Sequence, residues 1–406
     1  MDSREAYSQA QASKVTSYSS EDLYSRSVSK MMSVLLWVCL LSSSLILPLY
    51  LKNLQLTYAV SWISCVTSAA VIFCSAKKRF NATLAVFFMA LAVGAFSSPI
   101  IPAMLFGAIT AVGAGSTLIC SLKGKRIFFI ALLPILAYGV SFLITLDPIT
   151  SLFSLVPMLP AAAMGFASKR DTTATVSITL SAIAEVILVA AGISVWVYSV
   201  YGGLSPSILS EASEYFKGGV VYYSELGLKA MSATEITPAL QKELYASAND
   251  LVNISFGLIG ATCVITSYFS HKISLGLSAV CGTPLNPTSK NIRITVSAHA
   301  AWIFIVAYIL SFTTDSSNMI SFTANVGLNI CIMLLPCLVY VGFSAISALP
   351  KRLGLLGLIL WGGVIMLIFM SSSSFLFVFA LIGAIYIAIR HLDAWAKDHY
   401  SKGDKK

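Results

Sequence analysis

Residues 172–203 read TTATVSITLSAIAEVILVAAGISVWVYSVYGG, an almost unbroken apolar run with one acidic residue, Glu185, and no basic residue. A helix needs about 20 apolar residues to cross a bilayer, because each residue adds about 1.5 Å. The run lacks the alternation with a period of two that a membrane β-barrel requires. The stretch therefore predicts a transmembrane helix.

The rest of the chain has the same character. Of its 406 residues, 57% are hydrophobic and 11% are charged, and the mean hydropathy is +0.84. Average soluble domains carry about 25% charged residues, so the composition excludes a soluble enzyme, a disordered protein and a disulfide-rich secreted module. We predict an all-α, polytopic transmembrane helical bundle of about 12 (10–12) spans, at 31–51, 57–76, 82–98, 99–122, 127–146, 149–168, 172–203, 251–271, 293–313, 317–347, 353–370 and 372–390.

The 26 basic residues predict the orientation. If the N-terminus lies in the cytoplasm and the spans alternate, 22 basic residues fall on the inner side, and only Lys52, Lys217, Lys229 and Lys242 fall on the outer side. Basic loops are concentrated on the cytoplasmic side of membranes. We therefore expect both termini in the cytoplasm, and the net charge of +9 is an orientation signal.

These spans divide the chain into five parts. One long segment is expected on the outer side as a helical cap, with helix starts at Ser205-Pro206 and Thr237-Pro238 and a helix end at Gly218-Gly219. This cap is either a pair of interfacial helices or a lid or docking surface. The expected parts are a flexible cytoplasmic tail (1–30), an N-terminal transmembrane half (31–203), the extracytoplasmic cap (204–250), a C-terminal transmembrane half (251–390) and a charged cytoplasmic tail (391–406).

Motifs for catalysis, metals and nucleic acids are absent from the sequence. None of the eight cysteines forms a Cys-x-x-Cys pair or stands at ligand spacing from a histidine. No phosphate-binding glycine loop, His-Glu-x-x-His helix or Gly-x-Ser-x-Gly elbow is present. The basic residues lack interleaved aromatic residues. We therefore predict no metal, no cofactor, no nucleic-acid partner and no enzyme activity.

Polar residues inside the spans are the best indication of function. Glu185 is the one acid well inside a span, where a charge costs about 2.5–3.5 kcal/mol on insertion scales. Ser177, Ser181 and Glu185 are spaced by four and so share one helical face. This polar stripe either lines a binding site or bonds to a neighbouring helix in packing.

His299, Asn325 and Asn329 are further candidates in the second half. Asn325 and Asn329 also stand four apart, on one face of span 317–347. Each of the three is either part of a substrate-binding site or a structural hydrogen-bonding residue. If they converge with Glu185, they would form one polar site within the bundle.

Two Pro-x-x-Pro segments add another signal, with Pro99 and Pro102 in one and Pro157 and Pro160 in the other. Both lie early in runs that end at a basic cluster, which suggests a weak parallel repeat over 82–126 and 127–170. Helix breaks at corresponding positions of repeats are typical of transporter binding sites. Proline is also common in ordinary membrane helices.

Several segments occur in a characteristic order. They are Pro102-Ala103, Pro160-Ala161, Asp250-Leu251-Val252-Asn253 after the long insert, Gly327-Leu328-Asn329, Lys351-Arg352 and a closing Arg390-His391-Leu392-Asp393. In this order, over residues 31–395, the chain resembles the YybS-like family of bacterial membrane proteins. Its early half is similar in arrangement to the substrate-binding subunits of energy-coupling-factor vitamin transporters. Those subunits dock on a partner through an Ala-x-x-x-Ala pattern in the first helix, whereas span 31–51 contains no alanine.

The resemblance implies a protein of the bacterial cytoplasmic membrane and supplies no functional residues. Combined with the polar stripe, it favours a non-catalytic integral membrane protein that binds or transports a small solute. The expected partners are the lipid bilayer, that solute and a further membrane protein. The alternative is a structural or interaction protein of the cell envelope.

Overall fold

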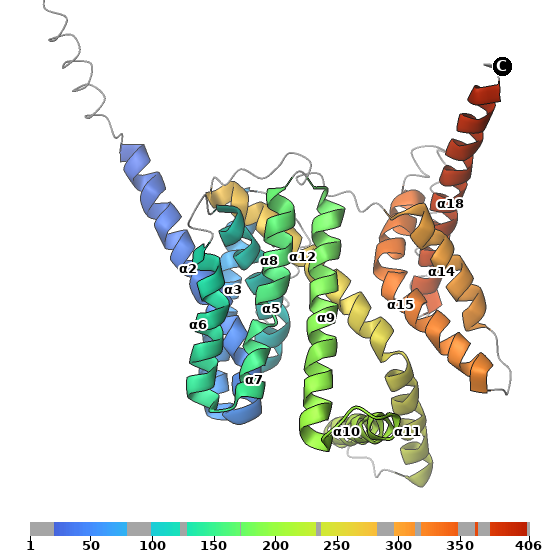
Figure 1. Cartoon of the computed structure of the whole chain (residues 1–406), viewed down its shortest axis with the longest axis horizontal. Coiled ribbons are helices and arrows are strands. Elements are labelled where there is room, and N and C mark those ends of the chain that lie inside the picture. The colour runs from blue at the N-terminus through green and yellow to red at the C-terminus, as the bar shows by residue number, and fades with distance from the viewer. Residues whose placement is uncertain are drawn as a thin grey trace, which may run out of the picture. The chain divides into compact units, whose positions relative to one another are not determined.

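A computed structural model describes residues 20–78, 99–121, 128–170, 172–232, 237–281, 296–312, 318–347, 362–363 and 374–403. Within these ranges the regular structure is helical and contains no strand (Figure 1). The helices are α2 (Ser20–Lys52), α3 (Leu54–Lys78), α5 (Ile100–Ser121), α6 (Phe128–Thr145), α7 (Pro148–Leu152), the 3-10 helix η2 (Phe153–Leu155), α8 (Met158–Lys169), α9 (Ala174–Tyr201), α10 (Pro206–Ser232), α11 (Pro238–Asn253), α12 (Ser255–Cys281), α14 (Ala298–Ser311), α15 (Asn318–Ser347) and α18 (Ser374–Gly403).

Seven helical segments of the described chain are long and apolar enough to cross a membrane. An eighth is formed if α11 and α12, which meet at a bend of 60°, count as one broken span. These segments indicate an integral membrane protein, and they confirm the predicted all-helical class. The seven are Met31–Lys52, Leu54–Ser75, Pro102–Ser121, Pro148–Lys169, Ala174–Tyr201, Phe322–Ser347 and Leu376–Ala396.

Seven of the predicted spans overlap these seven segments, and the span at 251–271 overlaps α12, which counts as a span only together with α11. The spans at 127–146 and 293–313 correspond to the shorter helices α6 and α14. The span at 82–98 lies outside the described residues, and so does the span at 353–370 except for residues 362–363. The total of about 12 spans therefore stays a prediction.

Both expected tails contain helix. α2 begins at Ser20, inside the segment expected to be flexible, and α18 continues to Gly403, through most of the charged C-terminal segment. Starting a helix is unfavourable, whereas extending an existing helix gains one hydrogen bond for each residue added. Polar residues next to a membrane helix can therefore extend it. Residues 20–30 and 391–403 therefore prolong helices that begin or end in the apolar spans.

The two pairs of prolines occupy helix starts. Pro99 directly precedes α5, and Pro102 lies in its first turn, where the missing N–H of proline has no intrahelical partner to lose. Pro157 is the N-cap of α8, and Pro160 lies in its first turn. The second pair follows η2 and so marks an interruption in the helical run from α7 to α8. The residues before Pro99 lie outside the description.

The chain divides into two compact units. Unit 1 comprises residues 1–172 and 269–290, and unit 2 comprises residues 173–268 and 291–406. In unit 1, α2 packs against α3, α5 and α6. Hydroxyl groups join these helices: Ser68 Oγ lies 2.6 Å from Thr110 Oγ1 on α5, and Ser43 Oγ lies 2.9 Å from Ser64 Oγ. Such interhelical hydrogen bonds hold membrane helices together where lipid removes the hydrophobic driving force.

In unit 2, α15 packs against α14 and α18. Their shared core contains the fully buried side chains of Phe304, Leu338 and Ala380. Two glycines bring α15 and α18 into backbone contact. A Cβ atom on Gly342 would overlap the carbonyl oxygen of Phe379, and one on Gly383 would overlap that of Leu338.

α9 has well-defined ends within unit 2. The Thr173 side chain caps its start by accepting a hydrogen bond from the backbone N–H of Val176, 3.4 Å away. Gly202 ends it in the left-handed conformation, with φ of 75°, and its N–H bonds to the Tyr198 carbonyl. Glycine adopts this conformation without the steric cost that a Cβ would bring. The helix between these caps carries the predicted polar stripe.

The insert folds as two helices. α10 and α11 begin at the predicted prolines, and the Thr237 side chain caps α11 by accepting from the Leu240 N–H at 3.3 Å. The predicted helix end at Gly218-Gly219 is wrong, because α10 continues to Ser232. Neither glycine takes a positive φ, and glycine ends a helix only when it leaves the helical conformation; inside a helix it costs only about 1 kcal/mol.

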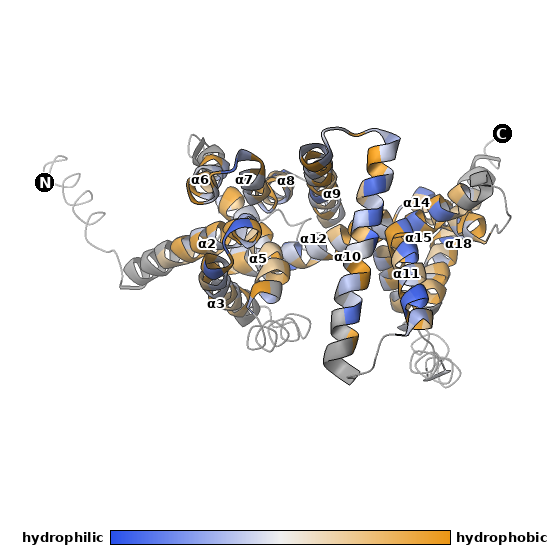
Figure 2. Cartoon of the chain, turned by 90° about the horizontal axis from the view of Figure 1, so that it is seen from below, coloured by the Kyte–Doolittle hydropathy of each residue, from blue (hydrophilic) through white to orange (hydrophobic). Residues whose placement is uncertain are grey.

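α10 lies across the end of α9. Figure 1 shows α10 almost end-on, whereas α9 runs along the plane of the view. Figure 2 shows both hydrophilic and hydrophobic residues along α10. Trp196 of α9 contacts the rings of Tyr215 and Phe216, with centroid distances of 5.8 and 5.3 Å. Trp and Tyr concentrate at membrane–water interfaces, so this junction has the composition of an interfacial layer.

Candidate functional site

Glu185 lies on α9 against α12. Glu185 is 8% exposed, and both of its carboxylate oxygens accept hydrogen bonds from hydroxyl groups of α12. Thr266 Oγ1 donates to Oε2, and Ser267 Oγ donates to Oε1 at 3.2 Å. The Cys263 thiol also contacts the carboxylate. All three side-chain contacts of Glu185 therefore come from one stretch of α12, residues 263–267.

The predicted polar stripe is buried along its length. Ser177 and Ser181 have no exposed surface, and Ser181 Oγ has no hydrogen-bond partner among the described residues. Ser181 stands one turn before Glu185 on α9, and residues four apart on a helix lie about 5–6 Å apart at Cβ. The same helical face thus carries a buried hydroxyl without a hydrogen-bond partner in the described residues and, one turn on, a buried acid.

Glu185 has no cationic partner within the described chain. The ion pairs found there join Lys52 to Asp147 and Lys217 to Glu214. Within the described chain the Glu185 side chain contacts the hydroxyl groups of Thr266 and Ser267 and the thiol group of Cys263. Burying an unpaired charge in an apolar medium is strongly unfavourable. The neutral partners of Glu185 therefore leave the charge of its carboxylate form without a compensating cation in the described residues.

Asn329 holds the bend between α11 and α12. Its Oδ1 accepts from the backbone N–H of Gly257 at 2.7 Å, and its Nδ2 donates to the carbonyl oxygens of Asn253 and Asn325 at 2.6 and 2.8 Å. Gly257 lies in the first turn of α12, and Asn253 is the last residue of α11. These are backbone groups that a helix end leaves without intrahelical partners, so Asn329 caps both helices at once.

The remaining candidates do not join this network. Asn325 contributes only its backbone carbonyl, and His299 is an exposed residue in the first turn of α14. No hydrogen bond links Glu185, His299 and the asparagine side chains to one another in the described residues. Glu185 contacts α12 at Thr266 and Ser267, nine and ten residues beyond the Asn329 contact at Gly257, or about 14–15 Å along a helix. Convergence of all four on one site stays a prediction.

A cavity of about 550 Å³ lies within unit 2, between α9, α12, α14 and α15. Its polar contributions come from Thr175, Thr179, Tyr268 and Ser297, and the rest of the lining is apolar apart from backbone. The lining residues are Ala174, Thr175, Ile178, Thr179, Ala182, Ile183, Val186, Ile187, Gly260, Val264, Tyr268, Val296, Ser297, Ala300, Met333, Leu334 and Cys337. Ligand pockets commonly have about 300–1,000 Å³ and this kind of lining.

This cavity was not predicted from the sequence. Its lining on α9 includes Ile178, Ala182 and Val186, which again recur at intervals of four, on the face beside the polar stripe. The small residues Ala174, Ala182, Gly260 and Ala300 leave the space between the helices. The available signal was the clustering of small residues and threonines on one face of α9, but the partner helices could not be deduced from it.

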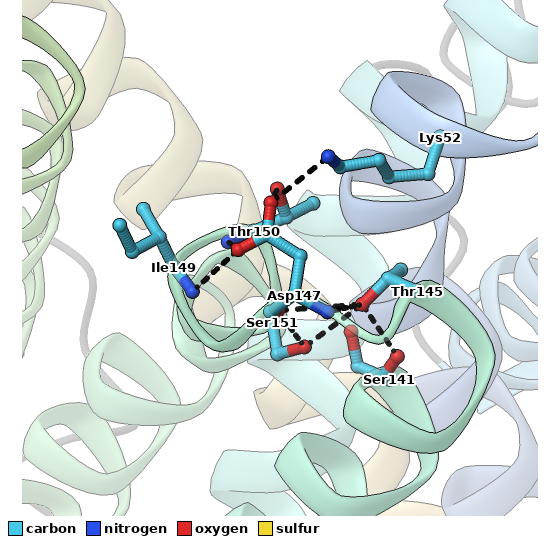
Figure 3. Close-up of polar contacts among 7 residues, drawn as sticks. All are labelled: Lys52, Ser141, Thr145, Asp147, Ile149, Thr150 and Ser151. Carbon is cyan, nitrogen blue, oxygen red and sulfur yellow. Dashed lines mark hydrogen bonds and ion pairs between the residues drawn. The ribbon is translucent and has the colours of Figure 1, made fainter. Parts of the chain in front are cut away.

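A second polar cluster, in unit 1, joins the end of α2 to the turn between α6 and α7 (Figure 3). Asp147 caps α7 by accepting from the N–H groups of Ile149 and Thr150, at 3.0 and 3.4 Å. Its Oδ2 accepts from Thr150 Oγ1 at 2.7 Å and lies 3.0 Å from Lys52 Nζ. The sequence indicated Lys52 only as one of the few basic residues expected outside.

The Asp147 cluster predicts a specific acid sensitivity. The Thr150 hydroxyl and then Lys52 lower the pKa of Asp147 to about 2, from about 3.9 in unfolded chains. Because the pKa of Asp147 is lower in the folded protein, its carboxylate stabilises the fold fully above about pH 4. This contribution to stability is lost as the pH falls through about 2. In thermal unfolding at stepped pH, the stability difference between wild type and Asp147→Asn should shrink over this window. A difference that stays constant there would contradict the assignment.

Metal-binding residues do not cluster in the part of the chain that the structure describes. No group of three His, Cys, Asp or Glu side chains is placed there to hold an ion. None of the eight cysteines, all of which lie in the described residues, forms a disulfide bond. Comparisons with protein-family models, with curated proteins and with solved structures found no match to this chain.

Proposed function

We propose that this protein is a non-catalytic integral membrane protein that binds or transports a small, largely apolar solute. The cavity between α9, α12, α14 and α15 carries this proposal, because its volume of about 550 Å³ suits a small organic molecule. Hydroxyl groups at Thr179 and Ser297 supply a few directional contacts in an otherwise apolar lining. A solute with an apolar body and one or two hydrogen-bonding groups fits this lining.

The proposed setting is the bacterial cytoplasmic membrane, with about 12 spans and both termini inside. The distribution of basic residues supports this orientation, with 22 of 26 on one side. The resemblance to the YybS-like family supports the bacterial setting. Lipid, the solute and a further membrane protein are the partners that this proposal includes.

A cavity-filling substitution tests the solute proposal. Ala182→Phe places a ring into the cavity from α9, whereas Ala191→Phe places the same ring on an exposed position nine residues on, on the opposite side of the helix. Wild type and both variants would be purified in lipid nanodiscs, and the small molecules extracted from each would be compared by mass spectrometry.

We expect a compound that wild type and Ala191→Phe retain and that Ala182→Phe loses at least about tenfold, equivalent to about 1.4 kcal/mol of binding. Val264→Leu, a smaller intrusion from α12, should reduce it less and provides a second variant if Ala182→Phe does not fold. Equal amounts of every extracted compound in all four folded proteins would contradict the proposal.

The second candidate function is an interaction protein of the cell envelope. It is favoured by exposed aromatic residues on α10, where Tyr215 and Tyr222 are 65% and 59% exposed. Deleting residues 205–249 separates the two functions. A solute-binding protein should retain its extracted compound after the deletion. An interaction protein should lose a partner protein that can be cross-linked to the wild type in membranes.

A further inference from the structure

The surroundings of Glu185 raise the question of how its charge is balanced. The residue is 8% exposed on a helix of membrane-spanning length. Its side-chain partners, Cys263, Thr266 and Ser267, are all neutral groups. A carboxylate in a membrane needs a cationic partner or must lose its charge. Within the described chain the partners are neutral, which leaves protonation of the carboxylate itself.

We propose that Glu185 is a proton-binding site, which takes up one proton to form the neutral acid and releases it to form the carboxylate. In the balanced step, hydronium gives a proton to Glu185 Oε2, leaving water and the carboxylic acid. This site shares no residue with the lining of the solute cavity, so either proposal can fail without the other.

The Thr266 hydroxyl can accommodate both forms of Glu185. Its Oγ1 is hydrogen-bonded to Glu185 Oε2 and also lies 3.0 Å from the backbone carbonyl oxygen of Cys263. A hydroxyl has one donor and two acceptor positions. Toward the carboxylate, Thr266 donates its proton to Oε2. When Oε2 carries a proton, Thr266 accepts from it and turns its own proton toward the Cys263 carbonyl.

The other contacts are compatible with this exchange. Ser267 Oγ donates to Oε1, an oxygen that remains an acceptor in the neutral acid. Every hydrogen bond needed for the charged form and for the neutral form is therefore available without moving either helix.

Among the described residues, α9 and α12 carry few other titratable groups close to Glu185 in sequence or contact. On α12 they are Cys263, which contacts the carboxylate, and then Tyr268, His271 and Lys272 farther along. On α9 they are Tyr198 and Tyr201, more than three turns away. Apart from Cys263, none of these makes a hydrogen bond or ion pair with Glu185. The protonation equilibrium of the site is thus governed by burial and the hydroxyl groups of α12.

Dicyclohexylcarbodiimide provides the test, because this apolar reagent adds to protonated carboxyl groups in membranes. The full-length protein in nanodiscs would be treated at stepped pH from about pH 5 to about pH 9, which spans the range between acidic and basic side chains. The adduct would be located by mass spectrometry of peptides. Glu185→Gln keeps the shape and hydrogen bonding of the residue, and Glu214→Gln removes an exposed acid as the matched control.

We expect an adduct on the α9 peptide that decreases as the pH rises, is absent in Glu185→Gln and is unchanged in Glu214→Gln. No adduct at any pH, or an adduct independent of pH, would overturn the proposal; the second result would indicate a permanently neutral packing residue. Protection by NaCl but not by choline chloride at equal ionic strength would also overturn it, in favour of a Na⁺ site.

Discussion

Replacing Gly383 with leucine should prevent α15 and α18 from packing and remove most of the folded protein. Even a Cβ on Gly383 would overlap the Leu338 carbonyl oxygen, and the facing Gly342 meets Phe379 in the same way. The obstructing atoms belong to the backbone, which cannot rotate aside as a side chain can. Overpacking a core costs about 1–3 kcal/mol, and leucine here adds a whole side chain at a backbone contact.

A graded series makes this prediction specific. Gly383→Ala should lower the midpoint of thermal unfolding, and Gly383→Leu should reduce the folded peak in size-exclusion chromatography further. Gly139→Leu on α6, where an added Cβ meets nothing within 4 Å, is the matched control and should keep that peak. If Gly383→Leu and Gly139→Leu behave alike, α15 and α18 do not meet at these glycines.

Seven of the predicted spans correspond to helices long and apolar enough to cross a membrane. These spans could be predicted because crossing a bilayer imposes a length and an apolar composition on each segment separately. The same physics says little about which helices pair. Gly342 and Gly383 carry no local signal that distinguishes them from Gly218 or Gly219, which lie in an open part of α10. Their importance arises only when α15 meets α18.

Helix starts were predictable from local chemistry, whereas one helix end was not. Thr237 caps α11 as expected because its side chain bonds a backbone group three residues ahead. Gly218 and Gly219 merely permit a helix to end, and α10 continues through them. Permissive residues predict a boundary only when the surrounding structure draws the chain out of the helix.

In the candidate site, too, the features of a single helix could be predicted from the sequence, whereas its contacts with another helix could not. The spacing of Ser177, Ser181 and Glu185 predicted a shared face, because helical periodicity is a property of one segment. Thr266 and Ser267 were not predicted as partners of Glu185, since they lie about 80 residues away and look like ordinary small polar residues of a membrane helix. His299 was predicted as a candidate from its place in a predicted span, but it is exposed and forms no hydrogen bond with Glu185. A position in a span does not by itself determine which residues a side chain contacts.

Replacing Asn329 with alanine should release the bend between α11 and α12. Asn329 is the residue that bonds the Gly257 N–H on one side of the bend and the Asn253 carbonyl on the other. Removing its side chain leaves both backbone groups without that partner. Leaving a buried group unsatisfied costs about 1–3 kcal/mol, although partly exposed groups such as the Asn253 contact recover some of this from water.

Asn325→Ala is the matched control, because Asn325 contributes only a backbone carbonyl that alanine retains. We expect Asn329→Ala to lower the free energy of unfolding by about 1–3 kcal/mol and Asn325→Ala to change it much less. Amide hydrogen exchange should also quicken at residues 254–258 in Asn329→Ala alone. Equal effects of the two substitutions would show that the polar face of α15, rather than the single side chain of Asn329, holds the bend.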